Sequence, residues 1–560
     1  MGVAARSRVR EAADGSLIER VAGRRTVAGW LAETAAALTA TALAVLLLAH
    51  LVGSPRAWLL FYDGDSVLPA LLAGSIRAEQ GADFALSAVA FVPESAVYLA
   101  LAALALPVQA TLALNAVVNL VALYAALRLV AGAVRPRRPG VDDDRPAVGP
   151  APGLALAAFA VFVGFALLES SASRETLELA SPLATTTYYS AAVIATVVCL
   201  ALLVRILRAV ARRATARRDT VRRAVVALAA VTAISVMSNP IVALWSVAPL
   251  LALAALALAF ELAPRRRLAA GAIALAAGSA IGAALRLPLA GVLTEGSGDK
   301  VHLAGSAASA RYYAHLLAQR WNDGGWPVIV VVALLLALGV AGTVVALRDR
   351  RLAPALVATA SWLIPFVAVL GAVALGTQSP RYLQPALFSP VLAVIAAPAL
   401  GRLLPVRARP AMRAGRMRAP RLAGPLALAL AAGMVAAATV AGATTARALD
   451  TVDASVGCVV DWVDASARTG VGTFWTVRAP KAYLADPRRL VQVDWQLNGY
   501  AWLVDREDYL ADRASFIVAS DEGGPVAVPA GLPEPERIEC GRYTILDYGS
   551  AVLEIGPAHS

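Results

Sequence analysis

Long apolar stretches recur along the first 446 residues and alternate with short polar segments. A helix needs roughly 20 apolar residues to cross the hydrocarbon core of a bilayer, so each stretch predicts a membrane span. Ser238-Asn239-Pro240 divides one long run into two spans, because proline cannot donate to the helical ladder. About eleven spans are predicted: Val27–Gly53, Thr111–Val134, Gly153–Leu168, Tyr188–Leu207, Ala224–Met237, Ile241–Phe260, Leu268–Leu285, Pro327–Leu347, Pro354–Leu375, Ala386–Leu403 and Ala423–Thr445.

Arginines gather in some of the polar segments and so indicate the direction of the spans. Eight lie between Arg205 and Arg223, and seven lie between Arg402 and Arg421. Because cytoplasmic loops carry such an excess of basic residues, we expect the Arg-rich N-terminus in the cytoplasm. An odd number of spans then leaves the C-terminus outside. The chain is expected to be a multi-pass protein of the cell (plasma) membrane.

The same orientation places five polar segments on the outer face of the membrane. These are Ser54–Pro93, Glu169–Thr187, Pro288–Trp326, Gly376–Pro385 and the tail after residue 446. Within the first outer loop (residues 54–110), Ser95–Leu106 predicts a short helix at the membrane surface. We therefore expect a transmembrane domain over residues 1–446 and a separate domain over residues 447–560.

The tail has the composition of a folded domain outside the bilayer. From Arg447 on, it holds 17 acidic and 10 basic residues. β-rich runs alternate with helix-compatible segments such as Ala479–Ala485, which predicts an extracytoplasmic α/β domain. The β-rich runs are Val471–Thr476, Leu490–Asp494, Ser515–Ser520 and Arg542–Tyr548.

Two of the three cysteines, Cys458 and Cys540, lie towards the two ends of this domain. In an oxidising compartment such a pair forms a disulfide more often than it stays reduced, so we expect a bridge between them. A metal site on the same two residues is the alternative, but it lacks further ligands. Cys199 lies within a predicted span, where packing is its expected role.

Composition supports the membrane interpretation and excludes two other classes. Of the 560 residues, 59% are hydrophobic and 16% are charged, and the mean hydropathy is +0.67. Soluble proteins carry about 25% charged residues. Aromatic residues make up only 6%, which argues against a β-barrel with its aromatic girdles. The net charge of +12 resides in the loop arginines, so no nucleic-acid partner is expected.

Acidic residues are scarce enough that their placement is informative. Asp63-Gly64-Asp65 follows the first predicted span, close to the membrane surface. The glycine lets both carboxylates face one site, where they could act as a general base or bind a divalent cation such as Mg²⁺, Mn²⁺ or Ca²⁺. The alternative is an Asx-turn in which Asp65 caps a helix that starts at Val67.

Two further outer segments carry candidate binding residues. Glu94 follows Pro93 at the start of the surface helix, where proline and an acid in the first turn are also ordinary helix-starting residues. Arg381 and Tyr382 lie between two predicted spans, on the side where basic residues are rare. A guanidinium there suits a lipid phosphate, because its fork of donors binds oxygens bidentately. Snorkelling to lipid headgroups is the alternative.

The long segment between the seventh and eighth predicted spans places aromatic residues beside charged ones. We expect substrate contacts from its candidate residues, which are His302, Arg311, Tyr312 and His315. The pattern suits sugar stacking and phosphate binding, and it equally suits an interfacial aromatic belt. The four histidines of the chain show no metal-ligand spacing, which argues against a zinc enzyme.

The layout of these features resembles the GT-C superfamily of membrane glycosyltransferases. The resemblance rests on the Asp-bearing outer loop after the first span, the short helix opened by Pro93, about eleven spans, the segment Arg381-Tyr382-Leu383-Gln384-Pro385 and the outer domain. The superfamily includes protein O-mannosyltransferases, aminoarabinose transferases and actinobacterial arabinofuranosyltransferases. The tail segment from Phe474 to Pro480 is similar to C-terminal domains of uncharacterised membrane proteins in that group.

The resemblance implies transfer of a sugar from a polyprenyl-phosphate donor to a glycan, lipid or protein acceptor, within membrane lipids. It implies that Asp63 or Asp65 deprotonates the acceptor hydroxyl and that Arg381 neutralises the phosphate of the departing carrier. The sequence departs from the family at two places. Asp-Gly-Asp replaces the Asp-Glu pair common in the first loop, and Val92-Pro93-Glu94 replaces a Lys-Pro-Pro or His-Pro-Pro segment.

Two other functions remain open from the sequence. A transporter or lipid flippase would place ionisable groups inside the spans and often shows internal repeats, whereas the predicted spans hold almost no charge and show no convincing repeat. A non-catalytic partner in envelope assembly would keep the architecture and would tolerate loss of Asp63 and Asp65.

Overall fold

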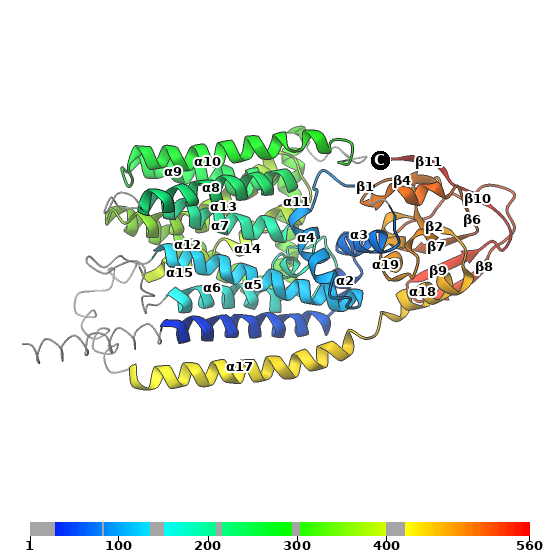
Figure 1. Ribbon diagram of the computed structural model, residues 1–560, viewed down its shortest axis with the longest axis horizontal. Coiled ribbons are helices and arrows are strands. Elements are labelled where there is room, and N and C mark those ends of the chain that lie inside the picture. The colour runs from blue at the N-terminus through cyan, green and yellow to red at the C-terminus, as the bar shows by residue number, and fades with distance from the viewer. Residues whose placement is uncertain (1–28, 81–82, 135–150, 209–215, 294–302, 399–419) are drawn as a thin grey trace, which may run out of the picture.

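The computed structural model describes residues 29–80, 83–134, 151–208, 216–293, 303–398 and 420–560. In these residues, a bundle of helices forms one part of an elongated molecule, and a strand-rich C-terminal domain forms the other part (Figure 1). We call the end of the bundle that faces this domain the domain end.

Among the described residues, eight helices are long and apolar enough to cross a membrane. They are Gly29–Val52, α5 (Val108–Val134), α7 (Ser190–Arg208), α8 (Ala216–Ser238), α10 (Arg265–Ala284), α12 (Trp326–Arg348), α13 (Leu352–Ala374) and α17 (Pro420–Ala448). Each coincides with a predicted span. The chain is therefore a polytopic helical membrane protein.

Residues 399–403 of the predicted span Ala386–Leu403 lie outside the described residues. In the part of the chain that the structure describes, the three remaining predicted spans are shorter or interrupted helices. They are α6 (Ala151–Leu167), the π-helical turn η2 (Ala243–Val247) continued by α9 (Ala248–Ala259), and α14 (Pro385–Phe388) followed by α15 (Leu392–Ala396). Pro390 lies in the turn between α14 and α15, where its missing N–H interrupts the helical hydrogen bonds. The count of eleven spans stays a prediction.

Small residues bring the helices of the bundle close together. A Cβ atom on Gly278 of α10 would lie 2.6 Å from the carbonyl oxygen of Ala229 in α8. One on Gly282 would lie 2.5 Å from that of Ala233. Membrane helices commonly gain van der Waals contact through small residues in this way.

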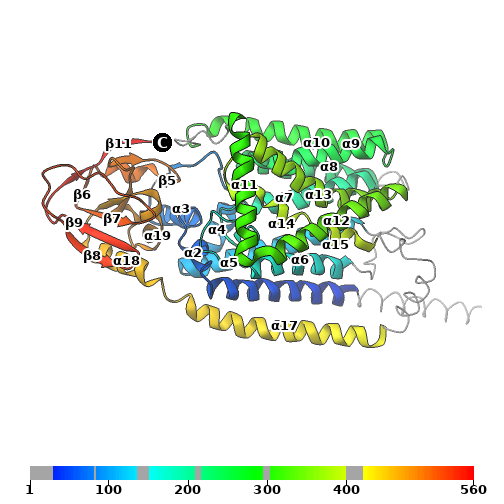
Figure 2. The ribbon, with the colours of Figure 1, turned by 180° about the vertical axis from the view of Figure 1, so that it is seen from behind.

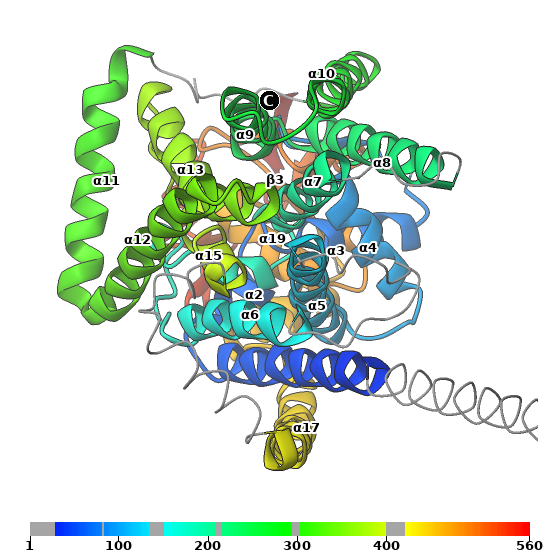
Figure 3. The same cartoon turned by 90° about the vertical axis from the view of Figure 1, so that its left-hand side faces the viewer.

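Short elements cover the domain end of the bundle. One of them, α11, runs across the bundle instead of along it (Figure 2, Figure 3). The short surface helix predicted at Ser95–Leu106 is present as α4, three residues earlier. The elements are α2 (Ala57–Phe61), α3 (Leu68–Arg77), β1 (Phe84–Ala85), α4 (Val92–Ala102), η1 (Ser181–Ala184), η3 (Leu287–Leu289), η4 (Leu303–Gly305), α11 (Ser306–Arg320), η5 (Trp321–Gly325) and η6 (Pro380–Leu383).

The C-terminal domain is built on a five-stranded mixed sheet of order β3-β2-β7-β9-β8. Strands β3, β2 and β7 are parallel, and β9 is antiparallel to β7 and β8. The elements are α18 (Ala454–Ser466), β2 (Gly470–Gly472), α19 (Phe474–Tyr483), η8 (Pro487–Arg489), β3 (Leu490–Gln492), β4 (Asn498–Tyr500), β5 (Val504–Asp505), η9 (Arg506–Leu510), β6 (Arg513–Ala514), β7 (Phe516–Ser520), β8 (Glu536–Cys540), β9 (Tyr543–Asp547), β10 (Leu553–Glu554) and β11 (Gly556–His559).

The predicted strand Val471–Thr476 is wrong in its second half, because β2 ends at Gly472 and α19 begins at Phe474. Phe474 and Val477 enter the core at helical spacing. The structure contains a disulfide between Cys458 in α18 and Cys540 in β8, which ties the first helix of the domain to the edge of its sheet.

Two strands far apart in the sequence join the domain to the bundle. β1, in the loop over residues 54–110, pairs antiparallel with β5 of the domain, with Phe84 opposite Asp505. Arg506 extends this junction, because its backbone N–H and its guanidinium both donate to Asp83. The first loop and the C-terminal domain therefore form one continuous structure around the candidate site.

Candidate functional site

Two buried carboxylates lie in the turn between α2 and α3 at the domain end of the bundle. Asp63 and Asp65 are 2% and 8% exposed. A guanidinium nitrogen (Nη1) of Arg174 lies 3.2 Å from Oδ2 of Asp63, and that of Arg381 lies 2.9 Å from Oδ2 of Asp65. Three segments that are separate in the sequence thus meet in two acid–guanidinium pairs.

Local hydrogen bonds fix the conformation of this turn. The backbone N–H of Asp65 donates to Oδ1 of Asp63 over 3.1 Å, and the hydroxyl of Tyr188 donates to the same oxygen over 3.0 Å. The hydroxyl of Thr187 donates to the carbonyl of Asp65 over 2.7 Å. Both carboxylates are therefore held in place before any ligand binds.

The capping alternative for Asp65 does not match the structure. α3 begins at Leu68, and no side chain caps its first turn. The carboxylate of Asp65 is bonded to Arg381 instead. Only the backbone carbonyl of Asp65 contributes to the start of the helix, by accepting the N–H of Leu68 over 3.2 Å.

Burial shifts the pKa of one carboxyl group of the site. It raises the pKa of the Asp63 carboxyl above its usual range, and the neighbouring carboxylate of Asp65 raises it further, whereas Arg174 and Tyr188 oppose the rise. A carboxyl with a raised pKa is a better proton acceptor than an ordinary aspartate once it is ionised. Among the candidate residues, Asp63 is therefore the one best suited to act as a base.

A third guanidinium approaches the turn from the C-terminal domain. Arg478 of α19 is fully buried, and its Nε donates to the carbonyl of Gly64 over 2.6 Å. Burial lowers its pKa to about 10, and the carboxylates of Asp65 and Asp63 counteract the fall. Two carboxylates thus lie among three guanidiniums, which leaves a local surplus of positive charge suited to an anion.

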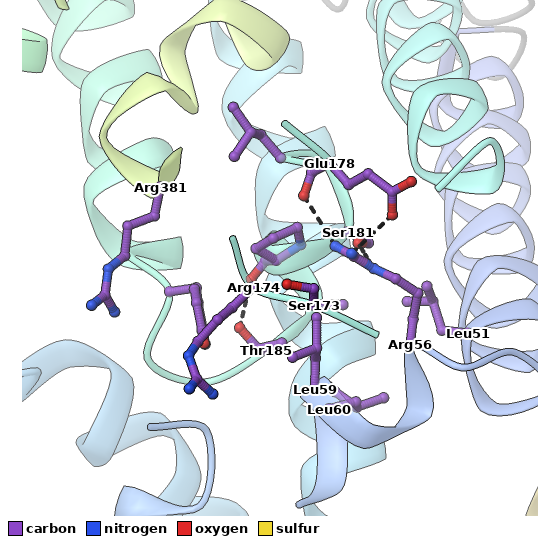
Figure 4. A pocket seen from close by; sticks show the side chains of 14 residues that line it. Leu51, Arg56, Leu59, Leu60, Ser173, Arg174, Glu178, Ser181, Thr185 and Arg381 are labelled. Atoms are coloured by element: carbon purple, nitrogen blue, oxygen red, sulfur yellow. Dashed lines mark hydrogen bonds and ion pairs between the residues drawn. The ribbon is translucent and has the colours of Figure 1, made fainter. Parts of the chain in front are cut away.

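A pocket opens beside the two acid–guanidinium pairs, and Arg174 and Arg381 reach into the same region of it (Figure 4). Its wall combines apolar side chains with cationic and hydroxyl groups. The lining residues are Leu51, Arg56, Leu59, Leu60, Ser173, Arg174, Glu178, Leu179, Ser181, Pro182, Ala184, Thr185, Tyr188 and Arg381. A ligand with an apolar chain and an anionic group fits this combination.

A buried ion-pair network supports the far side of the pocket (Figure 4). The guanidinium of Arg56 lies 3.0 Å from Glu178 and 3.4 Å from Glu169, and that of Arg320 lies 2.5 Å from Glu178. Glu178 also accepts the backbone N–H groups of Ser170 and Ser171. The network fixes the loop that carries Arg174 and Tyr188 into the site.

The structure distributes the other predicted residues unevenly. Tyr382 stacks on Tyr189 with 6.3 Å between ring centroids, and the Cζ atom of Arg381 lies 5.8 Å from the same Tyr189 ring. Tyr312 of α11 donates its hydroxyl to Glu175 over 3.0 Å, next to Arg174 in the chain. Tyr382 therefore borders the site, and Tyr312 contacts the loop that carries Arg174.

Arg311 and His315 of α11 are exposed at the surface of the molecule and do not line the pocket. His302 lies outside the described residues. Glu94 is buried in a separate small pocket with Ser235, Ser238 and Asn239. The sequence-based grouping of Arg311, His315 and Glu94 with Asp63 is therefore not reproduced.

Three residues of the site, Arg174, Tyr188 and Arg478, were not among the sequence candidates. Arg174 carried the same signal as Arg381, since both are arginines in segments predicted on the outer face, where arginines are rare. Tyr188 and Arg478 gave no such signal. Their position depends on how α7 and α19 pack against the turn, which the sequence pattern does not specify.

The donor set around Asp63 and Asp65 does not suit a divalent cation. Oxygens of both carboxylates accept guanidinium N–H groups, and three arginines repel a metal ion. Among the described residues, no group of three or more His, Cys, Asp or Glu side chains could hold a metal. We therefore derive no step through a metal ion.

Comparison with known proteins adds no assignment. No protein-family model matches the chain, and no curated protein matches it significantly.

Proposed function

We propose that the protein is a GT-C-type glycosyltransferase of the cell membrane. It transfers a sugar from a polyprenyl-phosphate donor to a glycan, lipid or protein acceptor of the envelope. The main support is the ion pair between Arg381 and Asp65 beside a pocket with an apolar wall. A polyprenyl phosphate has the matching chemistry, with an anionic head for the guanidiniums and a hydrocarbon chain for the leucines.

The reaction needs few groups. The acceptor oxygen attacks the anomeric carbon of the sugar while the bond from that carbon to the phosphate oxygen breaks. The phosphate leaves with the bonding electrons, and the acceptor proton passes to a carboxylate. Asp63 is the proposed proton acceptor. Arg381 and Arg174 stabilise the charge that grows on the departing phosphate. Because the donor diffuses within the bilayer, no nucleotide site is required.

Arg381 gains a second partner in this scheme. Without donor it is held by Asp65, and the donor phosphate draws the guanidinium towards itself because it offers more than one acceptor oxygen. Asp65 then holds the other side of the guanidinium and orients it. The side chain of Arg381 is 32% exposed, so one side of its guanidinium is open to a ligand.

The proposed orientation puts the N-terminus in the cytoplasm and the C-terminal domain outside. Two observations support it. The disulfide of the domain suits an oxidising compartment, and the arginine-dense loops between spans lie towards the opposite side by sequence.

Replacement of single residues in cells tests the proposal. Asp63→Asn and Arg381→Met should each cause loss of one envelope glycan and accumulation of a polyprenyl-phosphate sugar, measured by mass spectrometry. Asp83→Asn is the matched control, since it removes an acid of the same loop whose partner is Arg506. Unchanged glycans and lipid-linked sugars in normally expressed Asp63→Asn cells would refute the transferase assignment and leave an assembly role.

A transporter is the second candidate, and the pocket around Glu94 favours it. One carboxylate oxygen of Glu94 and the side-chain nitrogen of Asn239 are buried there without a hydrogen-bond partner among the described residues. Asn239 lies at the break between α8 and η2, and interrupted helices often carry ion sites in transporters. Solute uptake by vesicles that contain the wild-type protein, compared with uptake by vesicles that contain Glu94→Gln, would distinguish this function from sugar transfer.

A further inference from the structure

The C-terminal domain contacts the chain within and directly before the Asp63-Gly64-Asp65 turn. The hydroxyl of Tyr483 donates to the carbonyl of Phe61 over 2.9 Å, and the backbone N–H of Asp453 donates to the hydroxyl of Tyr62 over 2.8 Å. The next contact is the bond of Arg478 to Gly64 described above. The domain therefore contacts the backbone of the turn at Gly64 and the two residues that precede the turn.

The contact at Gly64 is tight. A Cβ atom on Gly64 would lie 3.2 Å from the ring of Phe474 and 3.2 Å from the ring of Trp475. The same Trp475 ring lies 3.5 Å from the Cζ atom of Arg174, the guanidinium that pairs with Asp63. α19 thus touches both the backbone of the turn and one of the cations that face it.

Arg478 is an unusual residue to bury in this position. Its guanidinium makes no ion pair with a carboxylate of the described residues. Its partners are the carbonyls of Gly64 and Leu503 and the ring of Phe474, at 4.7 Å. Nη2 is buried without a hydrogen-bond partner in the part of the chain that the structure describes. Such burial of a charge costs several kcal/mol, so packing alone does not account for an arginine here.

We infer that Arg478 is a positioning residue of the candidate site, and that the C-terminal domain completes this site by holding the Asp63-Gly64-Asp65 turn through it. The guanidinium fixes the carbonyl between the two aspartates and adds positive charge on their buried side. The turn then presents Asp63 to Arg174 and Asp65 to Arg381. For the catalytic consequence, the inference rests on the proposed transferase function.

Hydrogen–deuterium exchange on the full-length protein tests the positioning directly. In Arg478→Met, amides of residues 58–67 should exchange about 10- to 100-fold faster, the equivalent of one lost hydrogen bond to a charged group. Amides of β7 and β9 should keep their protection. Arg478→Lys should restore part of the protection, because an ammonium still reaches one carbonyl. Unchanged exchange in residues 58–67 of Arg478→Met would overturn the inference.

Arg506→Met is the matched control, since Arg506 also links the domain to the bundle but contacts Asp83 and Gly291 instead of the turn. It should leave exchange in residues 58–67 unchanged, and an equal rise there would overturn the inference. If Arg478→Met loses protection in β7 and β9 as well, the domain has lost stability as a whole, and the Gly64→Ala variant is used to test the contact at the turn. It should accelerate exchange of the turn while the sheet stays protected, and no acceleration would again overturn the inference.

Sugar transfer separates this inference from the proposed function. If the wild type transfers sugar, Arg478→Met should have a lower kcat and a smaller change in KM for the donor. Arg478→Lys should recover part of the lost kcat. Equal kcat in wild type and Arg478→Met would overturn the catalytic part. A wild type without transferase activity, together with the expected exchange pattern, would refute the proposed function and leave the positioning of the turn supported.

Discussion

Arg381 and Asp65 are separated by 316 positions in the chain, and their side chains meet with 2.9 Å between Nη1 and Oδ2. Asp65 follows α2, whereas Arg381 lies in the short helix η6 that precedes α14. The side chain of the aspartate is 11% exposed and that of the arginine is 32% exposed. One side of the pair is thus buried and fixed, and the other side can meet a ligand.

Replacement of Arg381 should separate the contribution of its charge to sugar transfer from the contribution of its bidentate geometry. Arg381→Met should lower sugar transfer by roughly 100-fold or more, because the departing phosphate loses a preorganised donor. Arg381→Lys should lie between this variant and wild type, since an ammonium supplies charge without the bidentate fork. Initial rates of transfer in reconstituted vesicles give the comparison.

Arg468→Met is the control for this series. Arg468 pairs with Asp547 in the C-terminal domain, and its side chain is 33% exposed, much like that of Arg381. The pair lies away from the pocket, so transfer should stay within about twofold of wild type. Equal losses in Arg468→Met and Arg381→Met would indicate a general effect of folding and would contradict the assigned role.

Loss of the charge on Glu178 should destabilise the fold. Its carboxylate is buried between Arg56 and Arg320, and Glu178→Gln leaves both guanidiniums with less compensation. Breaking a buried ion pair costs about 3 kcal/mol or more. Thermal unfolding in detergent should show a clearly lower midpoint. Glu175→Gln, at a carboxylate that accepts the hydroxyl of Tyr312, should shift it much less. Similar midpoints for wild type and Glu178→Gln would contradict the conclusion that the ion-pair network of Glu178 stabilises the fold.

The membrane architecture followed from the sequence because a bilayer imposes a length on every span. Eight predicted spans are present as long apolar helices. The prediction was weakest for Ala386–Leu403, where hydropathy continued across Pro390 although the helix did not. Hydropathy records apolar content and does not record the hydrogen bonds that a proline removes.

The candidate site was predictable only in part. Asp63, Asp65 and Arg381 stood out because charged residues are rare outside the loops, and they lie together in the structure. Arg478 could not be found in the same way. It belongs to a domain with ordinary charge density, and its role depends on the docking of α19 against a turn more than 400 residues earlier.

The disulfide should contribute strongly to the stability of the C-terminal domain. Cys458 and Cys540 are 82 positions apart, and closing a loop of this length lowers the entropy of the unfolded chain by an amount equivalent to about 4 kcal/mol. A Cys458→Ser/Cys540→Ser variant should unfold the domain at lower denaturant concentration. A reductant should lower the stability of the domain in the wild type and leave the stability of the variant unchanged. Identical curves for wild type and variant would contradict a structural bridge.

Glu94 should make stability depend on pH. α4 lies outside the eight long spans, and burial raises the pKa of Glu94 from 4.5 to about 7. Between these values the folded protein binds a proton that the unfolded chain has released. The stabilisation from this proton is therefore complete below pH 4.5 and is lost as pH rises through 7. The difference amounts to about 3 kcal/mol at pH 8, since one pKa unit corresponds to 1.36 kcal/mol.

Glu94→Gln should remove this dependence, because the amide stays neutral at every pH while it keeps the shape of the protonated acid. The free energy of unfolding of the variant should therefore equal that of wild type near pH 4.5 and exceed it at pH 8. Glu79→Gln, at an exposed carboxylate of the same outer loop, should follow the wild-type curve. Parallel curves for wild type and Glu94→Gln would mean that the folded protein does not hold the proton. The polar groups of Glu94 and Asn239 that lack a partner among the described residues would then find partners once the carboxylate is ionised.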